Sequence, residues 1–144
     1  MKNKSGVTLI VIMVSILVMF TIISSASVID FESITTANFE EYKSSISRVA
    51  DNVNSYFLDN NVLPVTNEIV SGSSLGDNFY NNLIKNADEN NNLFVVDVSL
   101  LNNYSIKKGR GTLIDKDIYL VAANTNNVYY LSGFKYKGIT YFTN

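Results

Sequence analysis

The sequence predicts an α+β fold in which one long N-terminal helix packs on a small antiparallel sheet of about four strands. Three observations lead to this prediction. Residues 7–58 contain neither glycine nor proline, so no strong helix breaker interrupts them. An apolar stripe with helical spacing occupies the second half of that segment. Short runs rich in β-branched and aromatic residues, separated by turn residues, follow in the C-terminal part of the chain.

The first half of the predicted helix is apolar on all sides. Residues 7–29 carry no charged side chain, and a helix of that length would span roughly 34 Å, enough to cross a hydrocarbon core of about 30 Å. Lys2 and Lys4 precede this segment, and acidic residues follow from Asp30 onward. This charge distribution predicts a cytoplasmic N-terminus and an extracytoplasmic chain after the segment. A cleaved secretory signal is the alternative, because residues 24–27 imitate a cleavage site of small residues.

The second half of the predicted helix, residues 30–61, is amphipathic. Apolar residues recur at spacings of three and four, and charged residues occupy the other faces. We expect this stripe to pack against the sheet. Asp59 and the two asparagines after it are expected to end the helix, and Pro64 prevents a restart. The residues of the stripe are Phe39, Tyr42, Ile46, Val49, Val53 and Tyr56.

The N-terminal third resembles the type IV pilins and pseudopilins. The likeness lies in a short basic leader that ends in glycine and in an apolar helix that becomes amphipathic. It implies that a prepilin peptidase cuts after Gly6 on the cytoplasmic side and that the new N-terminal residue, Val7, is methylated. It also implies that the helix first anchors the protein in the membrane and later packs among the helices of other pilin subunits in a filament. The residues assigned to this assembly helix are Thr8, Leu9, Ile10 and Val11.

The chain departs from the family pattern at two positions. Val7 stands where phenylalanine is usual, and Val11 stands where most members have glutamate. That glutamate is thought to pair with the N-terminal amine of a neighbouring subunit, which offsets the cost of a charge in an apolar core. Its absence resembles the minor pilin at the filament tip, which has no subunit above it. The alternative is a low-abundance or degenerate pilin that tolerates valine.

Residues 62–144 are predicted to form the extracytoplasmic head. Residues 62–74 are interpreted as a loop. A short helix is expected over residues 75–87, with an apolar stripe at spacing four and with Ser74 or Asp77 as its cap. The stripe consists of Leu75, Phe79, Leu83 and Ala87.

The remaining residues of the head predict strands and one helical turn within residues 99–106. Asn124–Asn127 is expected to be a four-residue hairpin loop. The aromatic pattern of this region resembles the sheet of pilin-like proteins from Gram-positive bacteria, clostridia especially. The expected strands are residues 93–98, 117–123, 128–132 and 139–143.

No catalytic, cofactor-binding or metal-binding residues are predicted. The chain has no histidine and no cysteine, which excludes imidazole-base and thiol chemistry. Asp115 and Asp117 suggest either a calcium half-site or a solvated turn. The basic loop at residues 107–110 would contact DNA or an acidic surface, or would simply be solvated. Without Lys2 and Lys4 the net charge changes from −2 to −4, which argues against nucleic acid as a partner.

The sequence therefore predicts four segments: a leader (1–6), a membrane-spanning and filament-core helix (7–29), the amphipathic half of the same helix (30–61) and the head (62–144). The predicted function is that of a structural subunit of a type IV pilus, with a minor role at the tip or in initiation. Two alternatives remain open. One is a pseudopilin of a secretion or DNA-uptake machine, and the other is a membrane-anchored binding domain that does not polymerise.

Overall fold

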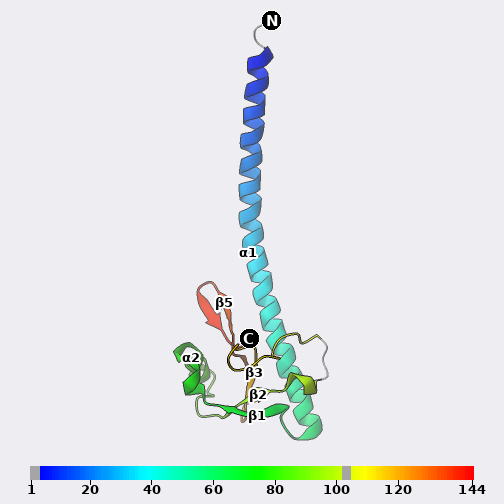
Figure 1. Cartoon of the computed structure of the whole chain (residues 1–144), viewed down its shortest axis with the longest axis vertical. Coiled ribbons are helices and arrows are strands. Elements are labelled where there is room, and N and C mark those ends of the chain that lie inside the picture. Colours follow the sequence, from blue (N-terminus) through cyan, green and yellow to red (C-terminus); the bar gives the residue numbers. More distant parts are fainter. Residues whose placement is uncertain (1–3, 102–104) are drawn as a thin grey trace. The chain divides into compact units, whose positions relative to one another are not determined.

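The computed structural model describes the backbone of residues 4–101 and 105–144, and the side chains of residues 10–16, 35–101 and 105–144. The fold is α+β, as predicted (Figure 1). The chain divides into two compact units, 1–38 and 39–144, and helix α1 (Lys4–Asn60) contributes to both. The second unit combines the C-terminal part of α1 with the predicted head (62–144) and contains all strands of the described residues. From here on, the whole unit 39–144 is called the head.

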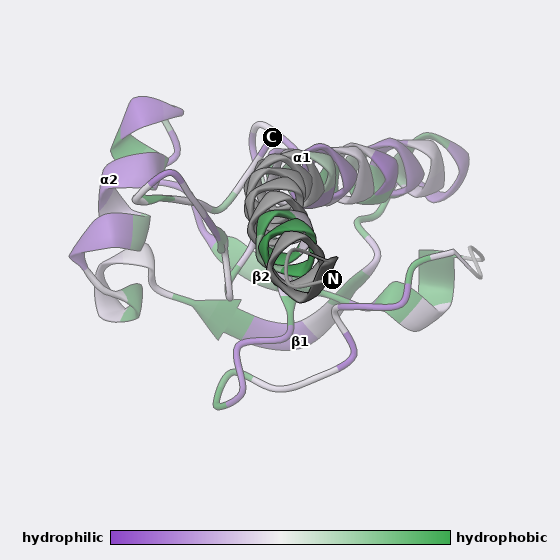
Figure 2. Ribbon diagram, turned by 90° about the horizontal axis from the view of Figure 1, so that it is seen from above, coloured by the Kyte–Doolittle hydropathy of each residue, from purple (hydrophilic) through white to green (hydrophobic). Residues whose placement is uncertain are grey.

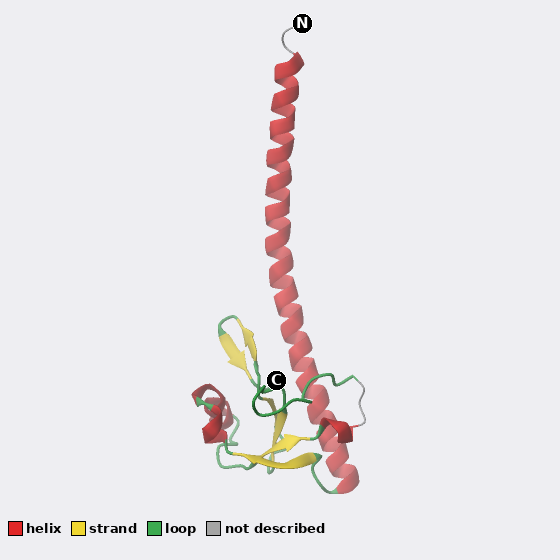
Figure 3. Cartoon of the chain, in the orientation of Figure 1, coloured by secondary structure: helices red, strands yellow, loops and turns green. Residues whose placement is uncertain are grey.

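The main sheet has four antiparallel strands in the order β1-β2-β3-β4, as many as predicted, but only three of the predicted strands, those at residues 93–98, 117–123 and 128–132, belong to it. A separate pair, β5 (Phe134–Tyr136) and β6 (Ile139–Tyr141), forms a hairpin beside it (Figure 3). Three short helical segments complete the head: η1 (Gly72–Leu75), α2 (Asp77–Lys85) and η2 (Val98–Leu101). The four strands of the main sheet are β1 (Val65–Val70), β2 (Leu93–Val96), β3 (Tyr119–Ala122) and β4 (Val128–Tyr130).

Both faces of the main sheet are covered. Successive side chains of a strand point to opposite faces, and along β3 they enter two different cores. Tyr119 and Val121 join the core that contains α1, whereas Leu120 and Ala122 join the core that contains α2. All four residues of β3 are consequently buried. The head is thus a three-layered unit, with α1 on one face of the sheet and α2 on the other.

The prediction of a loop over residues 62–74 is wrong, because this segment contains β1 and most of η1. β1 lies at an edge of the sheet, and its pairing with β2 is irregular between Val65 and Ile69. The irregular stretch leaves Asn67 and Glu68 exposed. An edge strand with a bulge and polar residues at its centre lacks the apolar alternation that identifies a strand in a sequence.

The strand predicted at residues 139–143 exists only as β6, and it does not belong to the main sheet. It pairs instead with β5, the strand immediately before it. Lys137 and Gly138 connect the two strands, and both have positive φ angles, 48° and 82°. Two such residues favour a tight hairpin whose twist matches that of the strands. Beyond β6 the chain runs along β4, where the Tyr130 amide donates to the Phe142 carbonyl at 2.7 Å.

The second predicted helix is shorter than expected: α2 covers Asp77–Lys85 rather than residues 75–87. Its N-cap is Gly76, with a φ of 97°, and neither Ser74 nor Asp77 caps it. Phe79 and Leu83 of the predicted stripe are buried, but Ala87 is exposed. The predicted hairpin loop also differs, because β3 ends at Ala122 and β4 begins at Val128, one residue more than expected.

Candidate functional site

The amphipathic part of α1 packs on one face of the sheet through a single stripe. Five residues of the predicted stripe are buried in the shared core, and Tyr56 is partly buried. Val49 and Val53 are fully inaccessible to solvent. The sheet contributes residues of β2, β3 and β4 to the same core, among them Val96, Val121 and Val128. The buried stripe residues are Phe39, Tyr42, Ile46, Val49 and Val53.

The β5–β6 hairpin holds α1 at the residue where the head begins. The Phe39 ring stacks on that of Tyr136, with ring centroids 4.3 Å apart, and the Tyr42 ring lies 5.1 Å from that of Phe134. The Tyr42 hydroxyl donates to the Tyr141 carbonyl at 2.6 Å. Burial raises the pKa of Tyr42 above 10.0, so the phenol remains a neutral donor. This cluster cannot be recognised from the sequence, because β5 contains only three residues.

The described residues near the N-terminus form an apolar surface around α1. The six apolar side chains among residues 10–16 are 50–64 % exposed, and this part of the helix is mainly hydrophobic in Figure 2. Ser15 is the exception, and its hydroxyl donates to the Val11 carbonyl at 2.8 Å. Val11 itself is 57 % exposed. The side chains of residues 6–9, to which the sequence assigned roles in processing and assembly, lie outside the described residues, and so do those of residues 24–27, which imitate a cleavage site.

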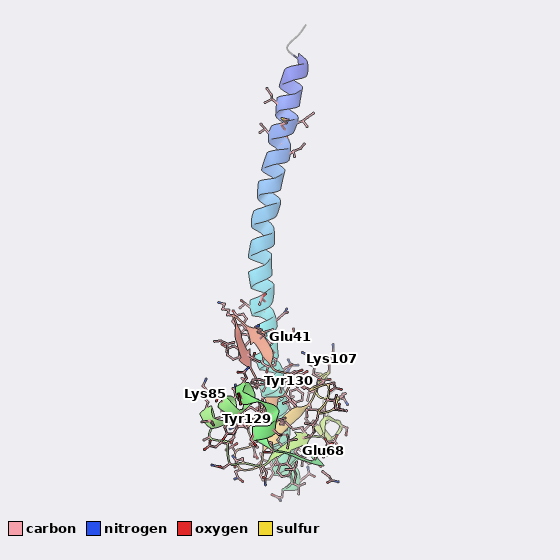
Figure 4. The ribbon with its side chains drawn as sticks, turned by 60° about the vertical axis from the view of Figure 1, so that its left-hand side comes forward. Glu41, Glu68, Lys85, Lys107, Tyr129 and Tyr130 are labelled. Carbon is pink, nitrogen blue, oxygen red and sulfur yellow. The ribbon has the colours of Figure 1, made fainter. Side chains whose placement is uncertain are left out.

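Among the residues whose side chains the structure describes, Asp88 is the charged residue that is completely buried. Its carboxylate accepts hydrogen bonds from four side chains, at distances between 2.5 and 2.8 Å. The donors come from the loop after α2, from the β3–β4 connection and from β4. Tyr129, one of them, lies in the interior of the head (Figure 4). The four donors are Asn91, Thr125, Asn127 and Tyr129.

The hydrogen bonds decide the charge state of Asp88. Burial by itself raises the pKa of the carboxyl, but the hydrogen bonds, led by that from Tyr129, stabilise the carboxylate and hold its pKa below 3.8. Burial and the bond to Asp88 together raise the pKa of Tyr129. Asp88 does not stand out in the sequence, because the residues after it, 89–92, are rich in asparagine and typical of a solvated loop.

The two aspartates considered for calcium have other partners. The Asp115 carboxylate accepts from the amides of Thr112 and Asp117 at 2.8 and 3.0 Å. The Asp117 carboxylate accepts from the Gly109 amide and from the Tyr130 hydroxyl at 2.9 and 2.8 Å. Within the described residues, no group of three or more acidic side chains is close enough to hold a metal ion. The pair therefore orders the turn between residues 109 and 117.

The basic loop lies beside α1. Lys107, Lys108 and Arg110 are exposed, and the Lys108 ammonium lies 5.6 Å from the centroid of the Tyr130 ring. Glu41 of α1 and Lys107 lie in the same part of the head and are labelled in Figure 4. Glu41 lines the small hollow between them together with Arg48, so the hollow contains charges of both signs. This mixture does not favour a nucleic-acid backbone, which needs a continuous basic surface.

Comparison with known protein families, with curated proteins and with solved structures finds no match for this chain. Among the residues whose side chains the structure describes, no helix combines the length and the apolar character needed to cross a membrane.

Truncation of the α1 stripe should destabilise the head. Ile46 is 1 % exposed, and replacing a buried isoleucine by alanine costs about 2–5 kcal/mol. We expect Ile46→Ala to lower the free energy of unfolding by that amount in urea titrations of the full chain in detergent micelles, followed by tyrosine fluorescence. Ser55→Ala, at an exposed position of α1, is the matched control. Equal unfolding midpoints for the two variants would show that the stripe contributes little.

The Asp88 network should give stability that depends on pH. The pKa of Asp88 in the folded protein lies below 3.8. The carboxylate therefore contributes fully to the free energy of unfolding above the pKa of the unfolded state, and this contribution is lost as pH falls through the folded-state pKa. Asp88→Asn should remove this loss of stability at low pH. It should also lower the free energy of unfolding at neutral pH by about 1.5–3 kcal/mol, since an amide cannot accept from all four donors. Thermal unfolding between pH 2 and pH 7 measures both effects. Asp51→Asn, at an exposed position, is the control. If the two variants show the same dependence of unfolding temperature on pH, the Asp88 carboxylate does not stabilise the head as described.

Proposed function

We propose that this protein is a structural subunit of a type IV pilus or a pilus-like filament. In this proposal a prepilin peptidase removes residues 1–6 and exposes Val7, which is then methylated. Residues 7–29 anchor the precursor in the membrane and later pack among the helices of other pilin subunits, while the head remains outside. The described structure is consistent with this division, because among the α1 residues whose side chains are described, 10–16 and 35–60, the buried stripe begins at Phe39.

The observation that carries the proposal is the apolar surface of residues 10–16. Six large apolar side chains point outward in all directions and are 50–64 % exposed. A helix that is hydrophobic all round needs an apolar environment on every side. Burying six such side chains is worth on the order of 10 kcal/mol. A membrane provides this environment for a single chain, and a bundle of like helices provides it after the chain leaves the membrane.

Val11 supports a minor role, at the filament tip or in initiation. In residues 10–16 there is no charged side chain, so this part of the helix offers no carboxylate to the N-terminal amine of a neighbouring subunit. A methylated amine left without a partner in an apolar core would be costly. A subunit at the tip avoids this cost, because no neighbouring subunit has to place its amine beside Val11. When only few copies are present, the cost arises at few contacts in the filament.

Processing after Gly6 is the first testable consequence. A larger side chain at this position, as in Gly6→Val, should block cleavage and leave the longer precursor in the membrane fraction. Ser5→Ala, one residue earlier in the leader, should be processed normally. Mass spectrometry of the N-terminal peptide distinguishes the two species. A mature N-terminus at Val7 in the Gly6→Val variant would remove the argument for a prepilin peptidase site.

Assembly should be more sensitive than anchoring to a polar group in the apolar helix. Val14→Asn leaves most of residues 7–29 apolar, so membrane insertion should persist. The amide would lack a hydrogen-bonding partner among packed helices, and we expect at least a tenfold loss from sheared filaments. Ser15→Ala is the control, because its hydroxyl already bonds within α1. Equal recovery of both variants in filaments would argue against helix packing, and absence of every form from filaments would favour the anchored binding domain.

A further inference from the structure

A hollow of about 460 Å³ lies in the head between the end of β1, η1, α2 and the loop at residues 89–92. Its size is within the range of small-ligand sites, about 300–1,000 Å³. The hollow lies on the α2 side of the sheet, and no step of the proposed filament assembly uses it. Figure 2 shows that α2 alternates between hydrophobic segments and hydrophilic ones.

The lining of this hollow is rich in hydrogen-bonding groups that the head does not use. The side chains of Glu89, Asn90 and Asn92 are exposed. Within the described part of the chain, these three side chains and the Tyr80 hydroxyl form no hydrogen bond and no ion pair. Together these groups offer both donors and acceptors. No lysine or arginine lines the hollow, so a phosphate or carboxylate ligand would meet the Glu89 carboxylate without a compensating cation.

The loop that carries these groups is held in place before any ligand binds. Asn91 donates to the buried Asp88 carboxylate at 2.7 Å and accepts from the Asn124 side chain at 2.6 Å. The Ala123 amide donates to the Asn92 carbonyl at 3.1 Å. The asparagine-rich loop is thereby fixed to the β3–β4 connection. A site whose backbone is already held in place loses less conformational entropy on binding.

An apolar surface accompanies the polar groups. Tyr80 is partly buried and packs on the α2 core, and Ile69 is 64 % exposed on β1. Both residues line the hollow. A ligand that suits this lining has many hydroxyl or amide groups, no negative charge and one face of C–H groups that can lie on an aromatic ring. A sugar ring has all of these properties.

We propose that this hollow binds a neutral saccharide unit. The Asn90 and Asn92 amides, the Glu89 carboxylate and the Tyr80 hydroxyl bond to the sugar hydroxyls, and the Tyr80 ring contacts its C–H face. An extended peptide is a different class of ligand. A peptide that adds to the edge strand β1 would also need pockets for alternate apolar side chains, whereas this hollow is lined mainly by serine and asparagine residues and by Glu89.

Saturation-transfer difference NMR on the full chain tests the proposal. The protein is kept in dodecylphosphocholine micelles, because a maltoside detergent would compete for the site. The probes are di-N-acetylchitobiose, lactose and maltose, with glucose 6-phosphate and a tetra-alanine peptide for comparison. We expect transfer to at least one of the three neutral sugars and at least tenfold weaker binding of glucose 6-phosphate.

Variants locate the site. Asn90→Ala and Tyr80→Phe should weaken sugar binding at least fivefold, and Asn78→Ala, exposed on α2 outside the hollow, should not. Unchanged near-ultraviolet circular dichroism checks that each variant folds. No transfer to any neutral sugar, equal transfer in all three variants, or preference for the peptide would each overturn the proposal. Because the test needs no filament, its result is independent of the proposed assembly.

Discussion

The head depends on the contact between one stripe of α1 and one face of the sheet. Neither surface is stable alone, because each presents a row of large apolar side chains. Residues 39–53 of α1 bury five of them, and β3 and β4 provide most of the facing layer. The β5–β6 hairpin then closes on Phe39 and Tyr42 at the start of the stripe. One helix thus contributes five buried residues to one core of the head and, in residues 10–16, carries exposed apolar side chains.

The opposite face of the sheet combines an apolar core with one buried charge, the Asp88 carboxylate. Beside the core formed with α2, the carboxylate of Asp88 collects four hydrogen bonds and so joins segments that are up to 41 residues apart in the chain. A buried carboxylate is tolerated only when its oxygens have such partners. The network also connects an asparagine-rich loop to the β3–β4 connection, and this loop lines the hollow.

The elements with strong periodicity were predictable, and those fixed by long-range partners were not. The stripe on α1 and the three strands β2–β4 follow from helical spacing and from runs of β-branched and aromatic residues. β1 was missed because its central residues, Asn67 and Glu68, are polar and exposed at a sheet edge. Asp88 was missed because its four partners meet only in the fold. The exposed apolar residues 10–16, in contrast, follow directly from the sequence.

The central claim is that α1 is cut before its apolar half and then packs with like helices. The most direct measurement is mass spectrometry of filaments sheared from the cell surface, which identifies the N-terminal peptide of this protein and its amount relative to other pilins. The account predicts a peptide that begins at methylated Val7 and is present at trace level. Complete absence from the filaments, with the protein intact in the membrane, would contradict filament assembly, and a stoichiometric amount would contradict the minor role inferred from Val11.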